Sequence, residues 1–359
     1  MIKLSDRAQK VILALSLIIL TIVLLGMCAF CFYWNKLDLL QLDTSSIDDD
    51  PTSLEKTVDA INVEEKLAGE SEGEVSQIIS QAVVEKLEEV NQEVIAPKQE
   101  IEEDKGVLNV LLIGTDESSE SFTNNANSDC MIIISIDKGK DTVKLVSIER
   151  GTGVPISVGQ YAGEYEWINN MVRVGGPGFL TRTVREVFRV DLMGYIRVNP
   201  YTFVKIVEAC GGATINLTQA EADYINKNSR DKKVTAGPNL LDGKTTELYA
   251  RCRAIDDDWS RIGRQRTVIQ AAITQSKDMS FGELNDMLNT VLPYVQTNLT
   301  KSQITELILQ VPSIAGKTAK QLTIPKSGTY SIMQNKFGKN MFSVDFETNA
   351  KELHEFLYN

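Results

Sequence analysis

The chain has 359 residues, with 37 Lys and Arg against 49 Asp and Glu, and a formal net charge of −12. It contains one histidine, His354, which argues against zinc sites built from several histidines and against Ser-His-Asp or Cys-His catalysis. Any general base must therefore be a carboxylate or a lysine. No glycine-rich phosphate loop followed by Lys-Ser or Lys-Thr is present, which argues against P-loop nucleotide hydrolysis.

The first element is an apolar run at residues 11–34 that contains no charged residue. It exceeds the roughly 20 residues needed to cross a hydrocarbon core, and it ends in aromatic residues instead of a small-x-small cleavage site. We therefore expect a retained transmembrane helix. Basic residues within 1–10 precede it and acidic sequence follows, so the positive-inside rule places residues 1–10 in the cytoplasm and everything after Lys36 outside the cell membrane.

Residues 35–106 form an acidic linker. Between Leu37 and Gly106 there are 20 acidic and 5 basic residues, whereas residues 107–359 hold 28 of each sign, so the domain after the linker carries no general attraction for nucleic acid. Apolar residues recur every three to four positions over 75–95, which predicts an amphipathic helix. Three roles stay open for it: a stalk packed on the domain, a short self-associating coiled coil, or a segment that folds with a partner.

Residues 107–359 are expected to form one α/β domain. Short apolar runs at 107–114, 130–137 and 143–148 predict buried strands. Helices are predicted at 200–209, 242–251, 261–275, 283–295 and 302–311. A strand is expected at 213–217, and a late strand pair is expected from 321–330 and 341–346, before an exposed terminal helix that carries His354 and ends near Leu357.

The five cysteines do not suggest a disulfide scaffold. Cys28 and Cys31 lie in the apolar run, which leaves Cys130, Cys210 and Cys252 outside it. Three cysteines cannot all pair within one chain. A Cys210–Cys252 bridge and three buried thiols both stay open, because sequence alone does not test geometry.

A cluster of arginines is the most specific feature of the domain. Residues 249–266 read YARCRAIDDDWSRIGRQR, with five arginines and no lysine. The planar guanidinium matches two phosphate or carboxylate oxygens at once, so this composition indicates a phosphorylated ligand. The alternative is a solvated charged helix in which Asp257 and Arg261 form an ordinary i,i+4 pair.

The spacing within the cluster favours the first interpretation. Arg251 and Arg253 are two positions apart and share a face if the chain is extended there. Arg261, Arg264 and Gln265 share one face of the predicted helix.

Two aspartates stand at strand ends. Asp116 ends the first strand in LLIGTD, and Asp129 precedes the second strand in NSDC. Carboxylates at the ends of neighbouring strands can converge on one hard cation, and magnesium takes one or two carboxylates plus phosphate oxygens. Turn chemistry is the alternative role for both aspartates. Arg150, after the third strand in SIER, would complete the rim.

The order LLIGTD, NSDC, SIER, WIN with Asn169, ACGG, GPNLLDG, YARCR and DDWSRIGRQR resembles the LytR-CpsA-Psr family of Gram-positive cell-wall proteins, over Val107 to Asn359. The resemblance implies an α-β-α sandwich with a central mixed β-sheet and an apolar groove for a polyprenyl tail. It also implies a magnesium-dependent phosphotransferase that moves a glycopolymer, such as teichoic acid or capsule, from undecaprenyl pyrophosphate to the 6-hydroxyl of N-acetylmuramic acid in peptidoglycan.

The same resemblance assigns roles by position. Asp116 and Asp129 match the magnesium-binding aspartates, and both are expected, with Arg150, to be catalytic. Asp129 is also our expected base toward the sugar hydroxyl. The residues that match the pyrophosphate-binding set are Arg150, Arg251, Arg253, Arg261, Arg264 and Gln265.

Three positions depart from the family pattern, and two charged groups are missing as a result. Asn127 stands where many members have arginine, and the run Glu149-Arg150-Gly151 replaces Pro-Arg-Asp, in which Glu149 offers a substitute carboxylate. Each lost charge-assisted hydrogen bond is worth about 1.5–3 kcal/mol, or roughly one to two decades in rate or affinity. Two other functions therefore stay open: a non-catalytic scaffold or regulator that binds polyprenyl pyrophosphate, and hydrolysis with water as the acceptor.

Overall fold

The computed structural model describes residues 41–42, 106–117, 119–156, 163–229, 233–275, 277, 279–335 and 337–359. The predicted transmembrane helix at 11–34, the cytoplasmic segment 1–10 and the amphipathic helix at 75–95 lie outside these residues. Within the described ranges, no helix has both the length and the apolar character needed to span a membrane.

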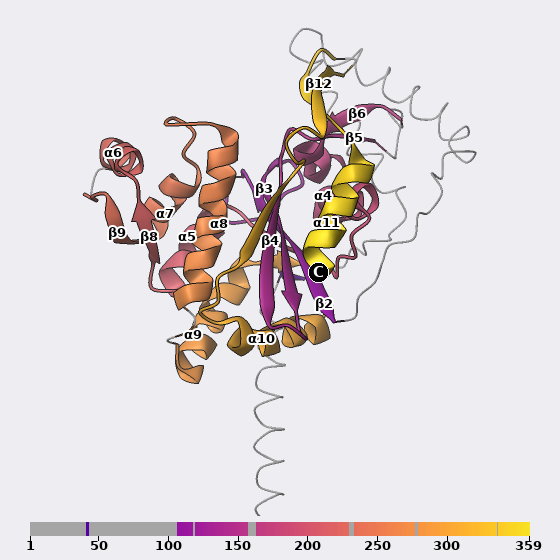
Figure 1. The fold of residues 1–359 in the computed structure, drawn as a ribbon. Coiled ribbons are helices and arrows are strands. Elements are labelled where there is room, and N and C mark those ends of the chain that lie inside the picture. The colour runs from indigo at the N-terminus through magenta and orange to yellow at the C-terminus, as the bar shows by residue number, and fades with distance from the viewer. Residues whose placement is uncertain are drawn as a thin grey trace, which may run out of the picture. The chain divides into compact units, whose positions relative to one another are not determined.

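A seven-stranded sheet in the order β1-β10-β7-β2-β3-β4-β11 forms the centre of the domain (Figure 1). Its strands are β1 (Gln41–Leu42), β2 (Val107–Thr115), β3 (Ser128–Asp137), β4 (Thr142–Ile148), β7 (Tyr195–Val198), β10 (Gln296–Thr297) and β11 (Lys320–Ile324). The pairs β2–β3, β3–β4 and β7–β10 are antiparallel, whereas β2–β7, β4–β11 and β1–β10 are parallel. The predicted mixed α/β fold is therefore confirmed.

Helices cover both faces of the sheet, which is why the predicted strand runs are apolar at almost every position. On one face, Leu111, Ile113 and Met131 pack with residues of α4 (Met171–Phe188) and α11 (Phe346–Tyr358). On the other face, Ile132 and Leu145 pack with residues of α8 (Asp258–Gln275) and α10 (Lys301–Ile314). Figure 1 shows α8 on one side of the strands and α11 on the other.

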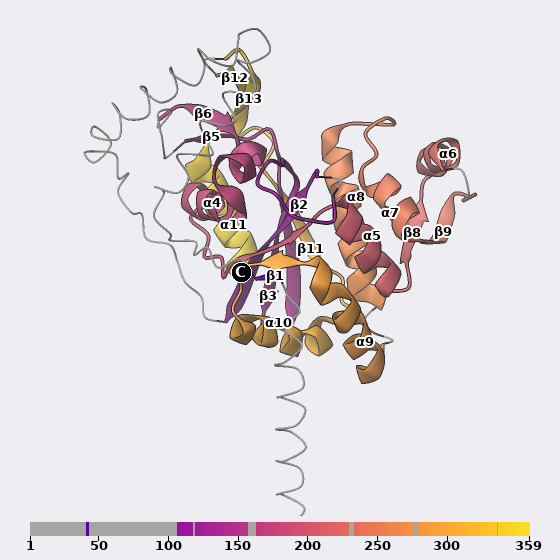
Figure 2. The ribbon, with the colours of Figure 1, turned by 180° about the vertical axis from the view of Figure 1, so that it is seen from behind.

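A smaller apolar cluster lies on the side of α8 that faces away from the sheet, as Figures 1 and 2 show. Its elements are α5 (Pro200–Ala209), β8 (Ala213–Leu217), α6 (Gln219–Asn228), β9 (Gly237–Leu241) and α7 (Gly243–Ala250). Antiparallel β8 and β9 supply Ile215 and Leu241, which are almost fully buried in this cluster. Because α8 contacts both cores, its side chains are fixed relative to the sheet.

The remaining elements lie at the edges of these layers. They are β5 (Gly153–Pro155), β6 (Tyr165–Trp167), η4 (Ile168–Asn170), α9 (Phe281–Val291), η6 (Leu292–Tyr294), β12 (Tyr330–Gln334) and β13 (Asn340–Val344). The β5–β6 and β12–β13 pairs are antiparallel. A bridge between Thr152 and Phe342 holds these two hairpins beside each other.

Two expectations from the sequence need correction. Most of the predicted strand at 321–330 does not pair with 341–346, because β11 joins the main sheet beside β4. Only Tyr330 of that run pairs there, as the first residue of β12, whose partner is β13. The terminal helix is not exposed, since Leu353 and Leu357 are fully buried and Nε2 of His354 lies 2.6 Å from the carbonyl oxygen of Arg189.

Helix α4 is absent from the sequence prediction, because Gly175 and Gly176 interrupt it. Both residues leave helical geometry, with φ of −154° and 80°, and Pro177 follows directly. Only glycine adopts the second of these values without strain, so the sequence resembles a turn at the point where two short helices are joined end to end.

Candidate functional site

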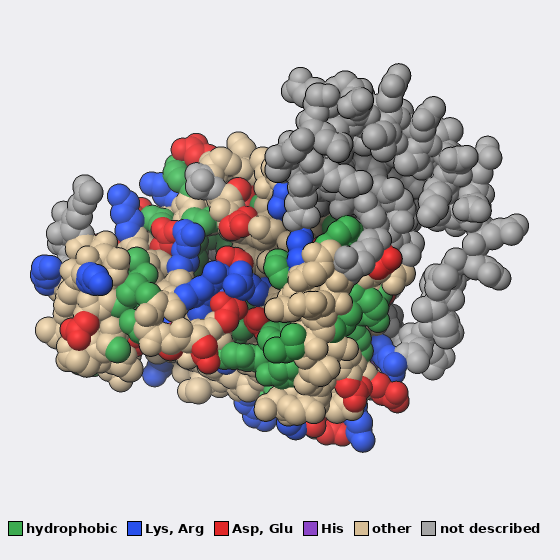
Figure 3. All heavy atoms as spheres, turned by 90° about the horizontal axis from the view of Figure 1, so that it is seen from above, with side chains coloured by type: hydrophobic (Ala, Val, Ile, Leu, Met, Phe, Trp, Pro, Cys, Tyr) green, Lys and Arg blue, Asp and Glu red, His purple; other side chains and the backbone are tan. Residues whose placement is uncertain are grey.

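A cavity of about 220 Å³ lies between α8, the ends of β2 and β3, and the start of α5. Part of its lining is apolar and includes Leu112, Val198, Phe203, Val268 and Ile269. Another part is polar and includes Asp116, Asp129, Arg251, Arg253, Arg261 and Gln265. Figure 3 shows basic and acidic side chains together in a hollow of the surface, with hydrophobic side chains beside them. The cavity thus joins a charged region to an apolar one.

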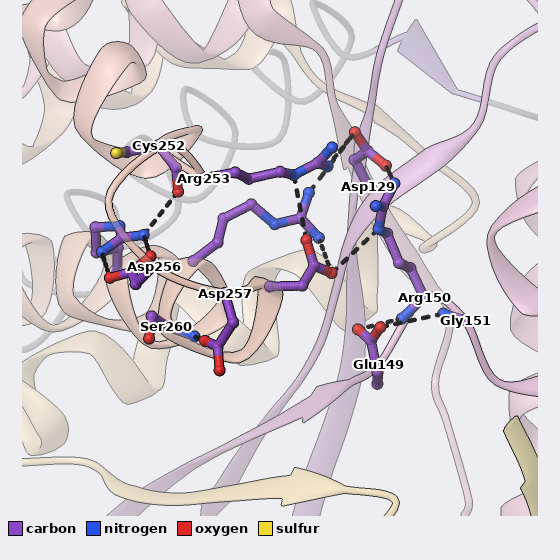
Figure 4. Close-up of polar contacts among 12 residues, drawn as sticks. Asp129, Glu149, Arg150, Gly151, Cys252, Arg253, Asp256, Asp257 and Ser260 are labelled. Atoms are coloured by element: carbon purple, nitrogen blue, oxygen red, sulfur yellow. Dashed lines mark hydrogen bonds and ion pairs between the residues drawn. The ribbon is translucent and has the colours of Figure 1, made fainter. Parts of the chain in front are cut away.

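Three arginines converge on two aspartates at the charged end. Asp129 Oδ1 lies 3.1 Å from Arg150, and its Oδ2 lies 3.0 Å from Arg253 and 3.7 Å from Arg261. Asp258 binds the same three guanidinium groups at 2.9–3.2 Å. In Figure 4, Arg150 and Arg253 approach Asp129 from opposite sides. We call these five residues the arginine–aspartate cluster.

The cluster is assembled from parts of the chain that are far apart in sequence. Asp129 lies near the start of β3, and Arg150 follows the adjacent antiparallel β4, so both stand at one end of the sheet. Arg261 and Asp258 are on the first turns of α8, and Arg253 lies in the loop before that helix. The apolar contacts between α8 and the sheet therefore position the cluster.

The two aspartates of the cluster do not fully offset the burial of Arg261 and the positive charges beside it. Burial lowers the pKa of Arg261, and the nearby charges of Arg253 and Arg150 lower it further, although Asp258 and Asp129 oppose this. Its side chain is only 2 % exposed, and its Nε makes no hydrogen bond among the described residues. An added anion at this position would stabilise the guanidinium charge.

Asp116 lies close to the cluster but is held differently. Its Oδ1 accepts a hydrogen bond of 2.8 Å from the backbone N–H of Asn127, and its Oδ2 accepts one of 3.1 Å from Asn127 Nδ2. A register irregularity between Gly114 and Thr115 in the β2–β3 pair precedes it. A Cβ on Gly114 would lie 2.8 Å from that of Cys130, so the close approach of these strands requires glycine.

The donor set fits the magnesium ion that the family resemblance implies. Asp116 and Asp129 line the same cavity, and two carboxylates completed by phosphate oxygens are a usual magnesium environment. The described residues contain no group of three or more Asp, Glu, His or Cys that could hold a metal alone.

The structure separates the predicted pyrophosphate-binding residues into two sets. Arg251, Arg253, Arg261 and Gln265 line the cavity, and Arg150 adjoins it through Asp129.

Arg264 does not line the cavity. It makes two contacts of 2.6–2.7 Å with Asp256 and donates a hydrogen bond of 2.7 Å to the carbonyl oxygen of Cys252. Figure 4 shows both partners beside the loop, away from Asp129. The predicted common face of α8 therefore holds for Arg261 and Gln265, one turn apart, and not for Arg264.

The geometry of the loop also differs from the expectation. Arg251 is the C-terminal cap of α7 with helical backbone angles, so the residues from 251 to 253 are not an extended strand. The alternative pair between Asp257 and Arg261 is not what forms: Asp257 accepts a hydrogen bond from the backbone N–H of Ser260, while Arg261 binds Asp258 and Asp129.

Sequence reasoning missed Asp258 as a site residue, and it noted Glu149 as a departure from the family that could supply a substitute carboxylate. Asp258 is the last of three consecutive aspartates, and its place three residues before Arg261, at the start of the run D-x-x-R-x-x-R-Q, is the signal that could have found it. Glu149 is 5 % exposed, and its carboxylate accepts hydrogen bonds from the backbone N–H groups of Arg150 and Gly151. Its place beside Arg150 makes it a candidate functional group.

Cys130, Cys210 and Cys252 are all unpaired thiols. Cys252 is buried and the other two are partly buried. Burial raises the pKa of Cys130 to about 12, so the thiol stays protonated at neutral pH and is a poor nucleophile. The alternative of a Cys210–Cys252 bridge is therefore not what the structure has.

The fold and the site together define a class of α/β protein in which arginines from a sheet end and a helix adjoin a partly apolar cavity. A family model described as LytR_cpsA_psr matches residues 73–355, and the chain belongs to this family. The resemblance seen in the motifs is thereby confirmed.

Relatives in this family carry functional names. The chain is 33 % identical over 213 residues to the polyisoprenyl-teichoic acid–peptidoglycan teichoic acid transferase TagU of Oceanobacillus iheyensis, covering 57 % of this chain and 63 % of that protein. It is 29 % identical over 228 residues to the TagU protein of Bacillus subtilis, covering 63 % and 70 %. The match thus spans less than two thirds of the Oceanobacillus protein.

Solved structures show the same fold. TagT bound to LIIa-WTA has a TM-score of 0.58 at 23 % identity, covering 73 % of this chain and 95 % of that one. The LytR-CPS2A-psr family protein YwtF (TagT) with bound octaprenyl pyrophosphate lipid has a TM-score of 0.54 at 20 % identity, covering 74 % and 99 %.

Proposed function

We propose that this protein is a phosphotransferase that is anchored in the cell membrane and whose domain, residues 107–359, lies on the outer side of that membrane. It moves a glycopolymer from undecaprenyl pyrophosphate to the N-acetylmuramic acid 6-hydroxyl of peptidoglycan. The observation that carries the proposal is the convergence of Arg150, Arg253 and Arg261 at the charged end of a cavity whose other lining is apolar. The names of the TagU relatives and the lipid bound to YwtF support this choice of donor and acceptor.

The cavity suits both parts of such a donor. A pyrophosphate diester carries two negative charges, and planar guanidinium groups bind its oxygens in pairs. The polyprenyl chain is a hydrocarbon, and Leu112, Phe203 and Val268 offer it apolar surface. When the donor enters, its pyrophosphate replaces the Asp129 oxygens as a partner of the three arginines, while Asp258 stays paired with them.

Transfer of the phosphoryl group depends mainly on positioning and on stabilising negative charge. In this site the buried Arg261 supplies a fixed positive charge, and Arg150 and Arg253 flank it. Asp258 holds the three side chains in place, because its two oxygens contact all of them. Asp116 and Asp129 would hold magnesium, which when bound neutralises phosphate charge as a Lewis acid.

The membrane location is part of the same proposal. The apolar run at residues 11–34 would anchor the protein, and the basic residues before it would keep the N-terminus in the cytoplasm. The domain would then face the cell wall. Protease added to intact protoplasts should digest residues 107–359 and spare a fusion tag at the N-terminus; protection of the domain would overturn this location.

A second function is favoured by one observation. Both oxygens of Asp129 are already in ion pairs with arginines, which disfavours its use as a proton acceptor. A protein that binds polyprenyl pyrophosphate without transferring the glycan, and acts as a scaffold or regulator, would tolerate this arrangement.

A transfer assay separates the two functions. Full-length protein in detergent is mixed with a polyprenyl-pyrophosphate-linked glycan, a peptidoglycan oligomer and magnesium, and the glycan–peptidoglycan product is measured. We expect product from the wild type, loss of product on chelation of magnesium, and at least about a 100-fold lower rate with Asp129→Ala. Equal rates for wild type and variant would overturn the catalytic proposal, while binding of the donor without product would favour the scaffold.

A further inference from the structure

A second cavity, of about 310 Å³, adjoins the arginine–aspartate cluster at Arg150. The apolar residues of α8 line the first cavity and not this one. The second cavity lies between the turn after β4, the β6–η4 segment and the β12–β13 hairpin. Its lining residues are Glu149, Arg150, Gly151, Trp167, Asn169, Ile332, Asn340, Met341 and Phe342. None of these residues lines the first cavity.

The lining combines aromatic rings with hydrogen-bonding groups. Trp167 and Phe342 provide aromatic surface, and Glu149 and Asn169 provide a carboxylate and an amide. Asn169 is only 6 % exposed, and its Oδ1 has no hydrogen-bond partner among the described residues. A buried amide oxygen without a partner carries a free-energy cost that a ligand hydroxyl or N–H would remove.

This chemistry suits a sugar better than a lipid or a polyanion. An amino sugar has apolar ring faces that pack on aromatic side chains, and hydroxyl and amide groups that bond to carboxylate and amide oxygens. Arg150 is the one cation among the lining residues, and Glu149 carries the opposite charge, so no concentrated positive charge is present for a polyanion. The first cavity, in contrast, concentrates positive charge, because Arg251, Arg253 and Arg261 all line it.

Arg150 connects the two cavities. It lines the second one, and its guanidinium group lies 3.1 Å from Asp129, which lines the first. Figure 4 shows Glu149 beside Arg150, on the side away from Arg253. A phosphate held by the cluster would therefore be approached from the first cavity by its lipid and from the second by an acceptor.

We propose that the second cavity is the subsite for the acceptor sugar and that Glu149 takes the proton from the attacking hydroxyl. This inference rests on the proposed phosphotransfer. The hydroxyl oxygen forms a bond to the glycan-bearing phosphorus, and its proton moves to the Glu149 carboxylate. The bond from that phosphorus to the bridging oxygen breaks, and polyprenyl phosphate leaves with the electron pair. Glu149 then releases the proton to solvent.

Glu149 replaces Asp129 as the expected base for a geometric reason. Asp129 is paired with guanidinium groups through both oxygens, whereas the hydrogen bonds of Glu149 come from the backbone N–H groups of Arg150 and Gly151. Burial raises the pKa of Glu149, and the negative charge of Asp258 raises it further. A carboxylate with a raised pKa is a stronger proton acceptor once ionised.

The space for the acceptor depends on the residue after Arg150. A Cβ on Gly151 would lie 3.3 Å from Phe342 Cε2 and 3.5 Å from Glu149 Oε1. A larger side chain would crowd the aromatic wall and the carboxylate together. The Glu149–Gly151 combination thus leaves room at the same place where it supplies a base.

The test uses full-length protein in detergent, a polyprenyl-pyrophosphate-linked glycan and a tetrasaccharide of alternating N-acetylglucosamine and N-acetylmuramic acid. Glu149→Gln keeps one side-chain oxygen, which can accept from one of the two backbone N–H groups, but removes the base. We expect kcat to fall by about 10²- to 10⁴-fold, with the Kd of the donor unchanged. Asn169→Ala should raise the KM for the tetrasaccharide at least about tenfold and leave kcat within about threefold.

Glu166→Gln is the matched control. Glu166 accepts a hydrogen bond from the backbone N–H of the next residue, Trp167, as Glu149 does from Arg150, but Glu166 is not a lining residue of either cavity. It should behave as wild type. Urea unfolding midpoints of all three variants verify that they are folded before the kinetics are compared.

The outcomes distinguish this inference from the proposed function. If wild type releases no polyprenyl phosphate with any acceptor, phosphotransfer itself fails. If wild type transfers the glycan and Glu149→Gln matches it, the base assignment is overturned. If nuclear magnetic resonance detects no contact between the tetrasaccharide and wild type, or if folded Asn169→Ala has an unchanged KM, the acceptor subsite is overturned while phosphotransfer stands.

Discussion

Arg261 and Arg264 lie three residues apart on α8, and both are buried, yet their surroundings differ. Arg264 is paired with Asp256 through two contacts, and these hydrogen bonds raise its pKa. Arg261 shares its two aspartates with two further arginines, and its pKa is lowered, first by burial. A buried arginine that has a carboxylate to itself stabilises the fold. A buried arginine that shares its carboxylates with other arginines can still bind an added anion.

Arg197 extends the comparison to another part of the domain. It is fully buried and donates to Glu117 at 2.7 Å, to Gln296 at 3.0 Å and to Thr115 at 3.2 Å. This network fixes the loop that carries Asp116, and Arg197 itself does not line the cavity. Arg197 therefore stabilises the fold, as Arg264 does.

The largest effect is expected from Arg264→Ala. The substitution leaves Asp256 and the largely buried Glu221 without their cation, and breaking such a pair costs about 3 kcal/mol. The free energy of unfolding, measured by urea titration, should fall by that amount, while the donor Kd of the folded fraction stays near that of wild type. A variant that keeps its stability but loses donor binding would show that Arg264 binds the donor and is not needed for the stability of the fold.

A smaller effect is expected from Arg261→Lys, which keeps the charge but removes the planar fork. Donor affinity should weaken about 10- to 100-fold, because one or more charge-assisted hydrogen bonds are lost. Titration of wild type and variant with polyprenyl pyrophosphate measures this. Arg266→Lys serves as the control, since Arg266 is on the same helix but bonds to Ser147 and Thr323 outside the cavity. Equal losses in both variants would contradict the special role of Arg261.

The smallest effect is expected from Asn127→Ala. It removes the Nδ2 hydrogen bond to Asp116 and leaves the backbone N–H bond in place. Because groups that orient a metal-binding carboxylate affect metal affinity by about 10- to 100-fold, we expect the low end of that range. The magnesium concentration for half-maximal transfer should rise about tenfold. An unchanged value would show that Asn127 does not orient Asp116 toward the metal.

Much of the fold is predictable from local pattern. The apolar runs place β2, β3 and β4 within one or two residues, because strands buried on both faces are mostly apolar and are interrupted by only a few polar residues, such as Asn109, Ser135 and Lys144. Helix α5 has the predicted bounds, since Pro200 starts it and Asn199 and Thr202 form a capping box.

Other elements carry no such pattern. Strand β7 has four residues and β10 has two, so each is defined by its neighbours in the sheet and not by its own sequence. The pairing of β11 with β4 is likewise the choice of a partner that is distant along the chain, and it leaves β12 to pair with β13, the next strand in sequence.

The sequence by itself determined the family, the strand cores and the residue types that phosphate recognition needs. Arginines and aspartates within a few motifs suffice for that, because their chemistry is carried by the side chain. Only the tertiary structure decided which arginines share aspartates and that Asp258 is one of those aspartates. It also decided that Glu149 lines the second cavity and not the first. The physical reason is that ion pairing and burial depend on distances between α8 and the ends of β3 and β4, which the packing of two apolar cores fixes.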